Sequence, residues 1–135
     1  MIRADNLKRR LAGRRVLVVE NEYFIAMDIA SALMDAGVDV VGPAVSVAGA
    51  IRLAETEQLD AAVLDVALSD GKVFPLADLL GSKAVPVVFA TAYECTSLPE
   101  RYRSMPCLEK PFEYQALVSL IAGSVAPIPE SVGPS

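Results

Sequence analysis

The amino-acid sequence predicts an α/β fold: a doubly wound, five-stranded parallel sheet with helices on both faces, in a single domain. Three observations support this prediction. The length of 135 residues suits one domain. Short apolar runs alternate with segments of helical periodicity, as in β-α-β units. Aromatic residues make up 6% of a chain that is 53% hydrophobic, so Val, Leu, Ile and Ala must build the core, as in a buried parallel sheet.

Five short runs are predicted to be strands because they are apolar, rich in β-branched residues or end at a polar residue. They cover residues 16–19, 38–41, 61–64, 85–90 and, more weakly, 107–108.

Four segments between or after these runs have helical patterns. They cover residues 22–36, 46–54, 73–80 and 113–125. Gly37 and Gly81 are predicted to end the first and third helices, and Ser46 to cap the second. Residues 95–104 are polar and contain Pro99, so we expect a mobile segment or a broken helix there, with little apolar area to anchor it.

This alternation favours right-handed crossovers and the flavodoxin-like strand order 2-1-3-4-5. We expect the domain to cover residues 14–125. Residues 1–13 are expected to form a basic arm or a short helix, and residues 126–135 a flexible tail.

Composition excludes several kinds of function. The chain has no His, which removes His-based triads, zinc–His sites and His phosphocarriers. Its two cysteines, Cys95 and Cys107, are expected to be reduced thiols in the core of a cytoplasmic protein. The first fifteen residues carry six basic side chains against one acid, a formal charge of +5, whereas the remaining 120 carry −10. The acidic body argues against a nucleic-acid groove, and no segment has the length of a signal peptide's apolar core or a membrane span.

Polar residues stand where four of the predicted strands end. Glu20 and Asn21 follow the first strand, Asp65 the third, Thr91 the fourth and Lys110 the fifth. The carboxyl ends of parallel strands meet at one edge of the sheet, so these groups should converge. Glu20, Asn21 and Asp65 offer the hard oxygen ligands that suit Mg²⁺. Asp65 is a candidate nucleophile for phosphoryl transfer, with a hydroxyl from Thr91 and a cation from Lys110 for the phosphoryl oxygens.

The sequence resembles the receiver domains of two-component response regulators. The resemblance covers about residues 14–125 and rests on Val-Leu-Val-Val-Glu-Asn-Glu (16–22), Val-Leu-Asp (63–65), Phe-Ala-Thr-Ala (89–92) and Glu-Lys-Pro-Phe (109–112). It implies the CheY-like form of the fold and a cytoplasmic phosphorelay protein that accepts a phosphoryl group from a histidine kinase or phosphotransfer protein. It also implies a downstream protein partner and no catalysis beyond its own phosphorylation and dephosphorylation; the acidic body and the lack of an apolar span lead us to expect no nucleic acid or membrane partner.

Carried over to this chain, the resemblance makes Asp65 the phosphoacceptor, Thr91 the switch hydroxyl and Lys110 the phosphate-binding cation. Mg²⁺ would be bound by Glu20, Asn21, Asp65 and the backbone carbonyl of Ala67. Gly71 matches a glycine in the loop after the phosphoacceptor.

Two positions depart from the family pattern. Asn21 stands where a second acid is usual, which should weaken Mg²⁺ binding. Cys107 stands where an aromatic residue is usual, and Tyr93, two residues after Thr91, is the expected substitute in the switch. Phe-Ala-Thr-Ala-Tyr resembles a subgroup of receivers that often stand alone, and the Met1 start and short tail favour that arrangement here.

Two alternatives remain open at this point. A haloacid-dehalogenase-like phosphohydrolase would need a second Asp where Ala67 stands, and would carry its nucleophile on the first strand. A pseudo-receiver that docks or dimerises without phosphorylation is favoured by Asn21 and Cys107, and disfavoured by Asp65, Thr91 and Lys110.

Overall fold

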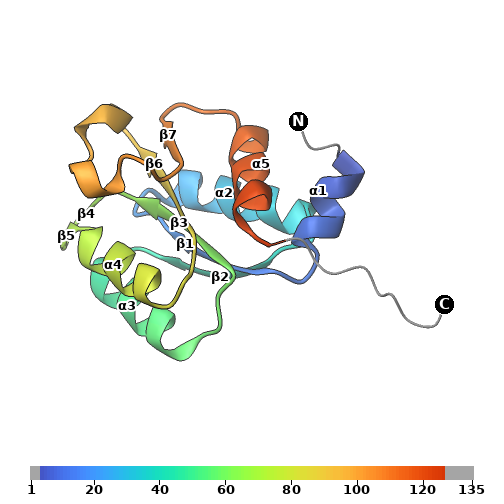
Figure 1. Ribbon diagram of the computed structural model, residues 1–135, viewed down its shortest axis with the longest axis horizontal. Helices are drawn as coiled ribbons and strands as arrows, with labels where there is room; N and C mark the ends of the chain where they lie inside the picture. The colour runs from blue at the N-terminus through green and yellow to red at the C-terminus, as the bar shows by residue number, and fades with distance from the viewer. Residues whose placement is uncertain (1–3, 127–135) are drawn as a thin grey trace.

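A five-stranded parallel sheet forms the centre of the molecule in the computed structural model, which describes residues 4–126 (Figure 1). Its strands are β1 (Arg15–Val19), β2 (Asp39–Ala44), β3 (Ala61–Asp65), β6 (Val87–Thr91) and β7 (Cys107–Glu109). The helices are α1 (Ala4–Leu11), α2 (Tyr23–Asp35), α3 (Val47–Thr56), α4 (Phe74–Ser82) and α5 (Tyr114–Ser124). The strand order β2-β1-β3-β6-β7 confirms the predicted flavodoxin-like order, since β6 and β7 are the fourth and fifth strands of this sheet.

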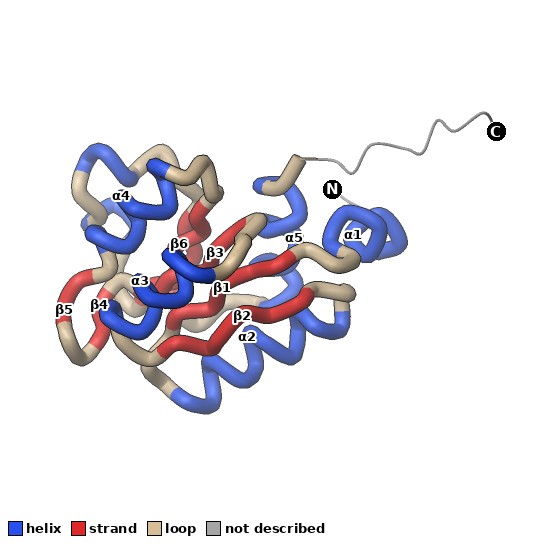
Figure 2. Tube along the Cα trace, turned by 90° about the horizontal axis from the view of Figure 1, so that it is seen from below, coloured by secondary structure: helices blue, strands red, loops and turns tan. Residues whose placement is uncertain are grey.

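Helices cover both faces of the sheet, as Figure 2 shows. Alternate residues of β1 enter two separate cores: Leu17 and Val19 join the core beneath α3 and α4, whereas Val16 and Val18 join the core beneath α1, α2 and α5. A strand buried on both faces needs an unbroken apolar run, which is why β1 and β3 were recognisable in the sequence.

The helix ends follow local chemistry. The Ser46 hydroxyl accepts a hydrogen bond from the Gly49 N–H at 3.0 Å and caps α3, as predicted. Gly37 takes a φ of +92° just after α2, a conformation that favours glycine and that ends the helix. The prediction for Gly81 was wrong, because α4 continues through it to Ser82 and the chain turns at Lys83 and Ala84.

The segment after β6 is broken into two short 3₁₀ turns, η1 (Cys95–Ser97) and η2 (Glu100–Tyr102), which confirms the expected broken helix. The expectation that it lacks an anchor was wrong. Leu98 and Tyr102 are both 2% exposed, and the Tyr102 ring stacks on Phe74 with centroids 4.8 Å apart. Two well-spaced apolar side chains hold this segment although its composition is mostly polar.

The expected tail and the first residues of the arm, at positions 127–135 and 1–3, lie outside the described residues. None of the described helices combines the length and apolar character needed to cross a membrane.

Candidate functional site

The site lies at the carboxyl edge of the sheet, where β1, β3, β6 and β7 end. β1 carries the chain to Glu20, whose N–H still pairs with the Ala44 carbonyl of the neighbouring strand at 3.0 Å. The Glu20 side chain is 1% exposed, and its Oε2 accepts a hydrogen bond from the Glu22 N–H at 3.1 Å. The structure therefore holds a buried carboxylate at the first strand end. Asn21 follows it in an exposed bend.

Asp65 is the last residue of β3 and is 7% exposed. Its pKa is raised from 3.8 to about 7, because burial penalises the charged form, because protonated Asp65 donates a hydrogen bond to the Glu20 carboxylate, and because the charge of Glu20 repels that of ionised Asp65. The charge of Lys110 and a hydrogen bond from the backbone of Ala67 act in the opposite direction. Two acidic groups thus share one small, poorly hydrated space.

Lys110 supplies the cation of the site. Its Nζ lies 2.7 Å from Glu20 Oε1 and 3.6 Å from Asp65 Oδ2. Burial acts to lower the pKa of Lys110, but its hydrogen bond to Glu20 and the charges of the surrounding carboxylates outweigh burial and raise it. The ammonium is therefore charged beside both acids, as the sequence predicted for these three residues.

Thr91 ends β6 and is 1% exposed. Its Oγ1 accepts a hydrogen bond from the N–H of Tyr93 at 3.0 Å, so the hydroxyl is tied to the start of the following loop. Tyr93 is 58% exposed, and the Lys72 ammonium lies 5.7 Å from its ring centroid. The described contacts thus link the hydroxyl of Thr91 to the exposed aromatic residue expected to replace the one missing at Cys107.

The prediction of two reduced thiols was wrong: Cys95 and Cys107 form a disulfide. Their sequence separation is 12, but the two 3₁₀ turns fold the chain back so that their Cα atoms lie 6.0 Å apart, a usual distance for a disulfide. Pairing of this kind depends on the path of the loop, which composition and spacing do not reveal. Cys107, expected to belong to the switch, is therefore cross-linked to η1.

A short antiparallel hairpin follows Asp65 and was missed in the sequence. It consists of β4 (Ala67–Leu68) and β5 (Gly71–Lys72). Gly71 has a φ of +140°, which explains the glycine at this position. Asp70 at the hairpin tip accepts hydrogen bonds from the N–H groups of Val47 at 2.8 Å and Ala48 at 3.1 Å, and these bonds lower its pKa. The segment after the phosphoacceptor candidate is thereby fixed to the start of α3. Strands of two residues leave no periodicity to detect.

The donor set of the site fits Mg²⁺ in chemical type. Glu20 Oε1 is buried, and the Lys110 ammonium, 2.7 Å away, is its described partner. The carboxyl groups of Glu20 and Asp65 both face the Lys110 ammonium, and the Ala67 backbone lies within hydrogen-bond distance of Asp65. Residues 4–126 contain no group of three or more His, Cys, Asp or Glu side chains arranged to hold a metal ion. A cation here would therefore rely on two carboxylates, backbone or amide oxygen and water, as Mg²⁺ sites commonly do.

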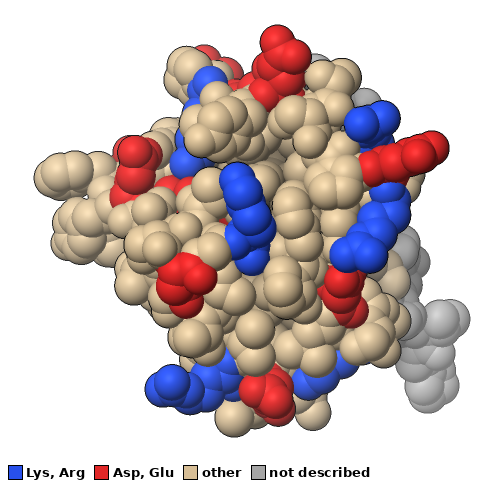
Figure 3. Space-filling view, turned by 90° about the vertical axis from the view of Figure 1, so that its left-hand side faces the viewer, with Lys and Arg blue, Asp and Glu red and all other residues tan. Residues whose placement is uncertain are grey.

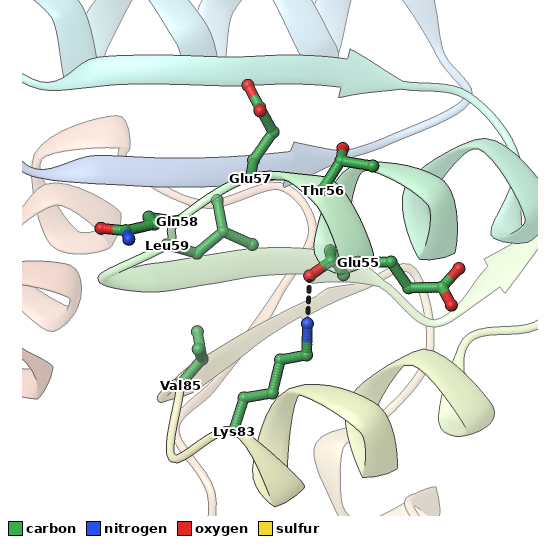
Figure 4. Close-up of a pocket in the computed structure, with 8 residues that line it drawn as sticks. Glu55, Thr56, Glu57, Gln58, Leu59, Lys83 and Val85 are labelled. Carbon is green, nitrogen blue, oxygen red and sulfur yellow. Dashed lines mark hydrogen bonds between the residues drawn. The ribbon is translucent and has the colours of Figure 1, made fainter.

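Two hollows on the surface differ in their relation to this site. One of about 460 Å³ adjoins Lys110 and is mostly apolar; it is lined by Glu22, Ile25, Ala92, Lys110, Pro111, Phe112 and Tyr114. Another of about 400 Å³ lies at the end of α3, near the start of β3, where Lys83 donates a hydrogen bond to the Ala54 carbonyl at 2.7 Å (Figure 4). The second hollow contains none of the predicted site residues.

The charges around the carboxyl edge are mixed. Figure 3 looks at the side of the molecule on which β4, β5 and α4 lie, and it shows acidic and basic side chains interspersed among uncharged ones. This face therefore has no single charge sign that would attract a partner of the opposite charge.

Proteins of known structure share this fold and are similar to this chain in sequence. SdrG from Sphingomonas melonis Fr1 is 36% identical, with a TM-score of 0.73, over 85% of this chain and 97% of SdrG. SdrG has also been solved in a BeF₃-activated conformation, which matches at 37% identity and a TM-score of 0.70. The response regulator PhyR from Brucella abortus is 28% identical, with a TM-score of 0.74, over 90% of this chain and 51% of PhyR. The chain is a member of the response-regulator receiver family.

The curated relatives of this receiver are regulatory proteins. The transcriptional regulatory protein PdtaR from Mycobacterium tuberculosis is 35% identical over 117 residues, which cover 84% of this chain and 57% of PdtaR. The receiver therefore spans about half the length of PdtaR and PhyR. A scan against models of protein families gives no match.

Proposed function

We propose that this receiver accepts a phosphoryl group on Asp65 from a phosphohistidine of a histidine kinase or phosphotransfer protein, with Mg²⁺ bound beside it. The observation that carries the proposal is the convergence of three strand ends: the Asp65 carboxyl, the Lys110 ammonium 3.6 Å from it and the buried Glu20 carboxylate. In the transfer, an Asp65 carboxylate oxygen forms a bond to phosphorus as the bond between phosphorus and the donor histidine nitrogen breaks.

Each residue of the site has a role in this proposal. Glu20, Asn21, Asp65 and the carbonyl of Ala67 would hold Mg²⁺, which neutralises charge on the phosphoryl oxygens when bound. Lys110 is charged and close enough to Asp65 to stabilise the same oxygens. Thr91 can donate its hydroxyl to a phosphoryl oxygen after releasing or turning from the Tyr93 N–H.

A protein partner suits the surface beside the site. Tyr23 and Phe24, at the start of α2, are 68% and 80% exposed, and they lie close in sequence to Glu20. The apolar hollow beside Lys110 adds further uncovered area on the same edge. Exposed aromatic side chains next to a hollow are typical of protein-binding surfaces. The BeF₃-activated conformation of SdrG, a relative, supports a response of this fold to a phosphoryl mimic.

The test is labelling by acetyl phosphate in the presence of Mg²⁺, followed by intact-mass measurement. The wild-type chain should gain one phosphoryl group, and Asp65→Asn should gain none while remaining folded. Asp70→Asn, which alters a nearby exposed carboxylate, is the matched control and should still be labelled. Equal labelling of Asp65→Asn would move the assignment to Glu20. A folded wild type that takes no label would favour the pseudo-receiver, and steady turnover of a phosphate monoester would favour the phosphohydrolase, for which Ala67 offers no acidic side chain.

A further inference from the structure

The disulfide joins two chain segments that lead to and from the phosphoryl-binding groups. Cys95 lies four residues after Thr91, at the start of η1, and Cys107 lies three residues before Lys110, at the start of β7. A second contact reinforces the bridge, since the Cys95 N–H donates to Glu109 Oε2 at 3.0 Å. Any movement of the loop after Thr91 must therefore carry the bridge with it or be restrained by it.

The bridge controls a defined part of that loop. From Leu98 onward the loop is anchored by the core, through Leu98 itself and through Tyr102, whose hydroxyl donates to Asp78 Oδ1 at 2.6 Å. Residues 92–97 differ: apart from the half-buried Cys95, their side chains are exposed. Residues 92–97 are tied to the rest of the fold by the bridge and the adjoining hydrogen bond from the Cys95 N–H to Glu109, and by the two contacts of Tyr93 with Thr91 and Lys72; the bridge is the covalent restraint among them.

We propose that the Cys95–Cys107 bridge is a redox modification site that exchanges with a dithiol, and that its oxidised form restrains residues 92–97 and thereby limits the response of this segment to phosphorylation. The effect on the response to phosphorylation rests on the proposed function. Both cysteines are half-buried, and Cys107 packs against the core, so each residue keeps part of its surface open to solvent, from where a thiolate would attack. The chain has two cysteines, and both are in the bridge, so no third thiol can compete for either sulfur.

The exchange is a balanced two-electron step. A thiolate of the dithiol attacks the sulfur of one cysteine, forms a mixed disulfide and displaces the other cysteine as a thiolate, which takes a proton. The second thiol of the reagent then closes its own disulfide and displaces the first cysteine, which is also protonated. The protein gains two electrons and two protons, and the dithiol becomes a cyclic disulfide. Opening the bridge returns conformational freedom to the loop that it had closed.

The first experiment needs no phosphoryl group. The full chain is prepared in two forms, one with the bridge oxidised and one reduced with dithiothreitol. The state of each form is verified by intact mass after alkylation of free thiols. We expect reduction to increase amide hydrogen exchange of residues 92–97 at least about fivefold and to leave the strands unchanged. The double variant Cys95→Ser/Cys107→Ser is the control: it should exchange like the reduced chain, with or without dithiothreitol.

The second experiment compares the two forms with beryllofluoride and Mg²⁺. We expect the change in exchange over residues 92–97 to be at least about fivefold smaller in the oxidised form. Equal exchange of the two forms without ligand, a bridge that dithiothreitol does not open in the folded chain, or unfolding upon reduction would each overturn the proposal. Equal responses to beryllofluoride would overturn its link to phosphorylation. If neither form takes label from acetyl phosphate on Asp65, the proposed function fails, and the redox site is then decided by the first experiment alone.

Discussion

The carboxyl of Asp65 lies in surroundings that oppose its ionisation, although the proposed reaction requires the carboxylate. Burial and the neighbouring Glu20 raise its pKa to about 7, whereas Lys110 acts to lower it. A divalent cation would act in the same direction as Lys110 and favour the charged form. In the proposed reaction, bound Mg²⁺ would therefore favour the ionised, reactive form of Asp65.

This arrangement predicts a pH-dependent cost to stability. Because the pKa of Asp65 is raised in the folded chain, the folded form binds more protons than the unfolded form between pH 3.8 and about 7, so stability falls as pH rises through that window. Asp65→Asn cannot ionise. We therefore compare the free energy of unfolding of this variant with that of the wild type, without Mg²⁺, at about pH 4 and at about pH 8. The variant should be the more stable of the two at pH 8, and the difference should be larger there than at pH 4 by on the order of 2 kcal/mol.

Urea unfolding at both pH values, with a chelator present, measures this difference. The control is Glu55→Gln, which neutralises an exposed carboxylate on α3 and should show no comparable change between the two pH values. A wild type whose stability rises over the window relative to Asp65→Asn would show that Lys110, rather than burial and Glu20, dominates the pKa of Asp65.

Substitutions of Asn21 test the proposed metal site through a single side chain. Its amide offers an oxygen ligand without a charge, and Asn21→Asp would add a carboxylate of the same shape. We expect this variant to bind Mg²⁺ more tightly in a calorimetric titration, and Asn21→Ala to bind it less tightly. Unchanged affinity in both variants would place the side chain at position 21 outside the metal shell.

At the scale of elements, the parts that the sequence predicted are those with local signals. An unbroken apolar run marks β3 because both of its faces are buried, and Ser46 marks the start of α3 because its hydroxyl caps the helix. Since strand ends meet at one edge in a parallel sheet, the meeting of Asp65 with Lys110 also followed from the sequence. The disulfide and the anchoring of η2 did not, since both depend on residues brought together by the path of the loop.

The anchor of η2 is itself testable. Tyr102 is buried among Phe74 and Phe89, and its hydroxyl donates to Asp78, whose other oxygen pairs with Arg101. Tyr102→Phe should lower the free energy of unfolding by about 1–2 kcal/mol, since it removes a hydrogen bond to a charged group. Tyr102→Ala should lower it by about 3–5 kcal/mol, since it also leaves a cavity.

Arg101→Ala is the matched control in urea unfolding. The pair between Arg101 and Asp78 has side chains that are 66% and 51% exposed, so its loss should cost less than about 1 kcal/mol. Because the Arg101 guanidinium also lies 4.7 Å from the Tyr102 ring centroid, a cost for Arg101→Ala that equals the cost of Tyr102→Ala would mean that the exposed contacts of Arg101, and not the burial of the ring, hold η2 in place.

At the scale of the whole molecule, the basic start of the chain is fastened to the acidic body. Arg14 Nη1 lies 3.7 Å from Asp60, and Arg15 lies 3.3 Å from Asp39 and 3.1 Å from Glu57. Arg10 donates to the Val125 carbonyl after α5 at 3.2 Å. The uneven charge of the sequence is thereby partly offset within the fold, at the end of the sheet opposite Asp65 (Figure 1).

Helix α1 is also part of the core, and this leads to the last prediction. Leu7 is 7% exposed and Leu11 is fully buried, and both join the core formed with α2 and α5. Leu11→Ala should therefore lower the free energy of unfolding by about 2–5 kcal/mol. Lys8→Ala, an exposed change on the same helix, should alter it by less than about 0.5 kcal/mol.

The two variants also separate stability from function. Because α1 lies at the far end of the strands from Asp65, folded Leu11→Ala should still take label from acetyl phosphate at the wild-type rate, measured by intact mass well below its unfolding temperature. Slower labelling of Leu11→Ala than of Lys8→Ala under those conditions would show that packing at the amino end of the sheet influences Asp65 at the opposite end. Equal stability of the two variants would show that α1 contributes little to the core despite the burial of Leu11.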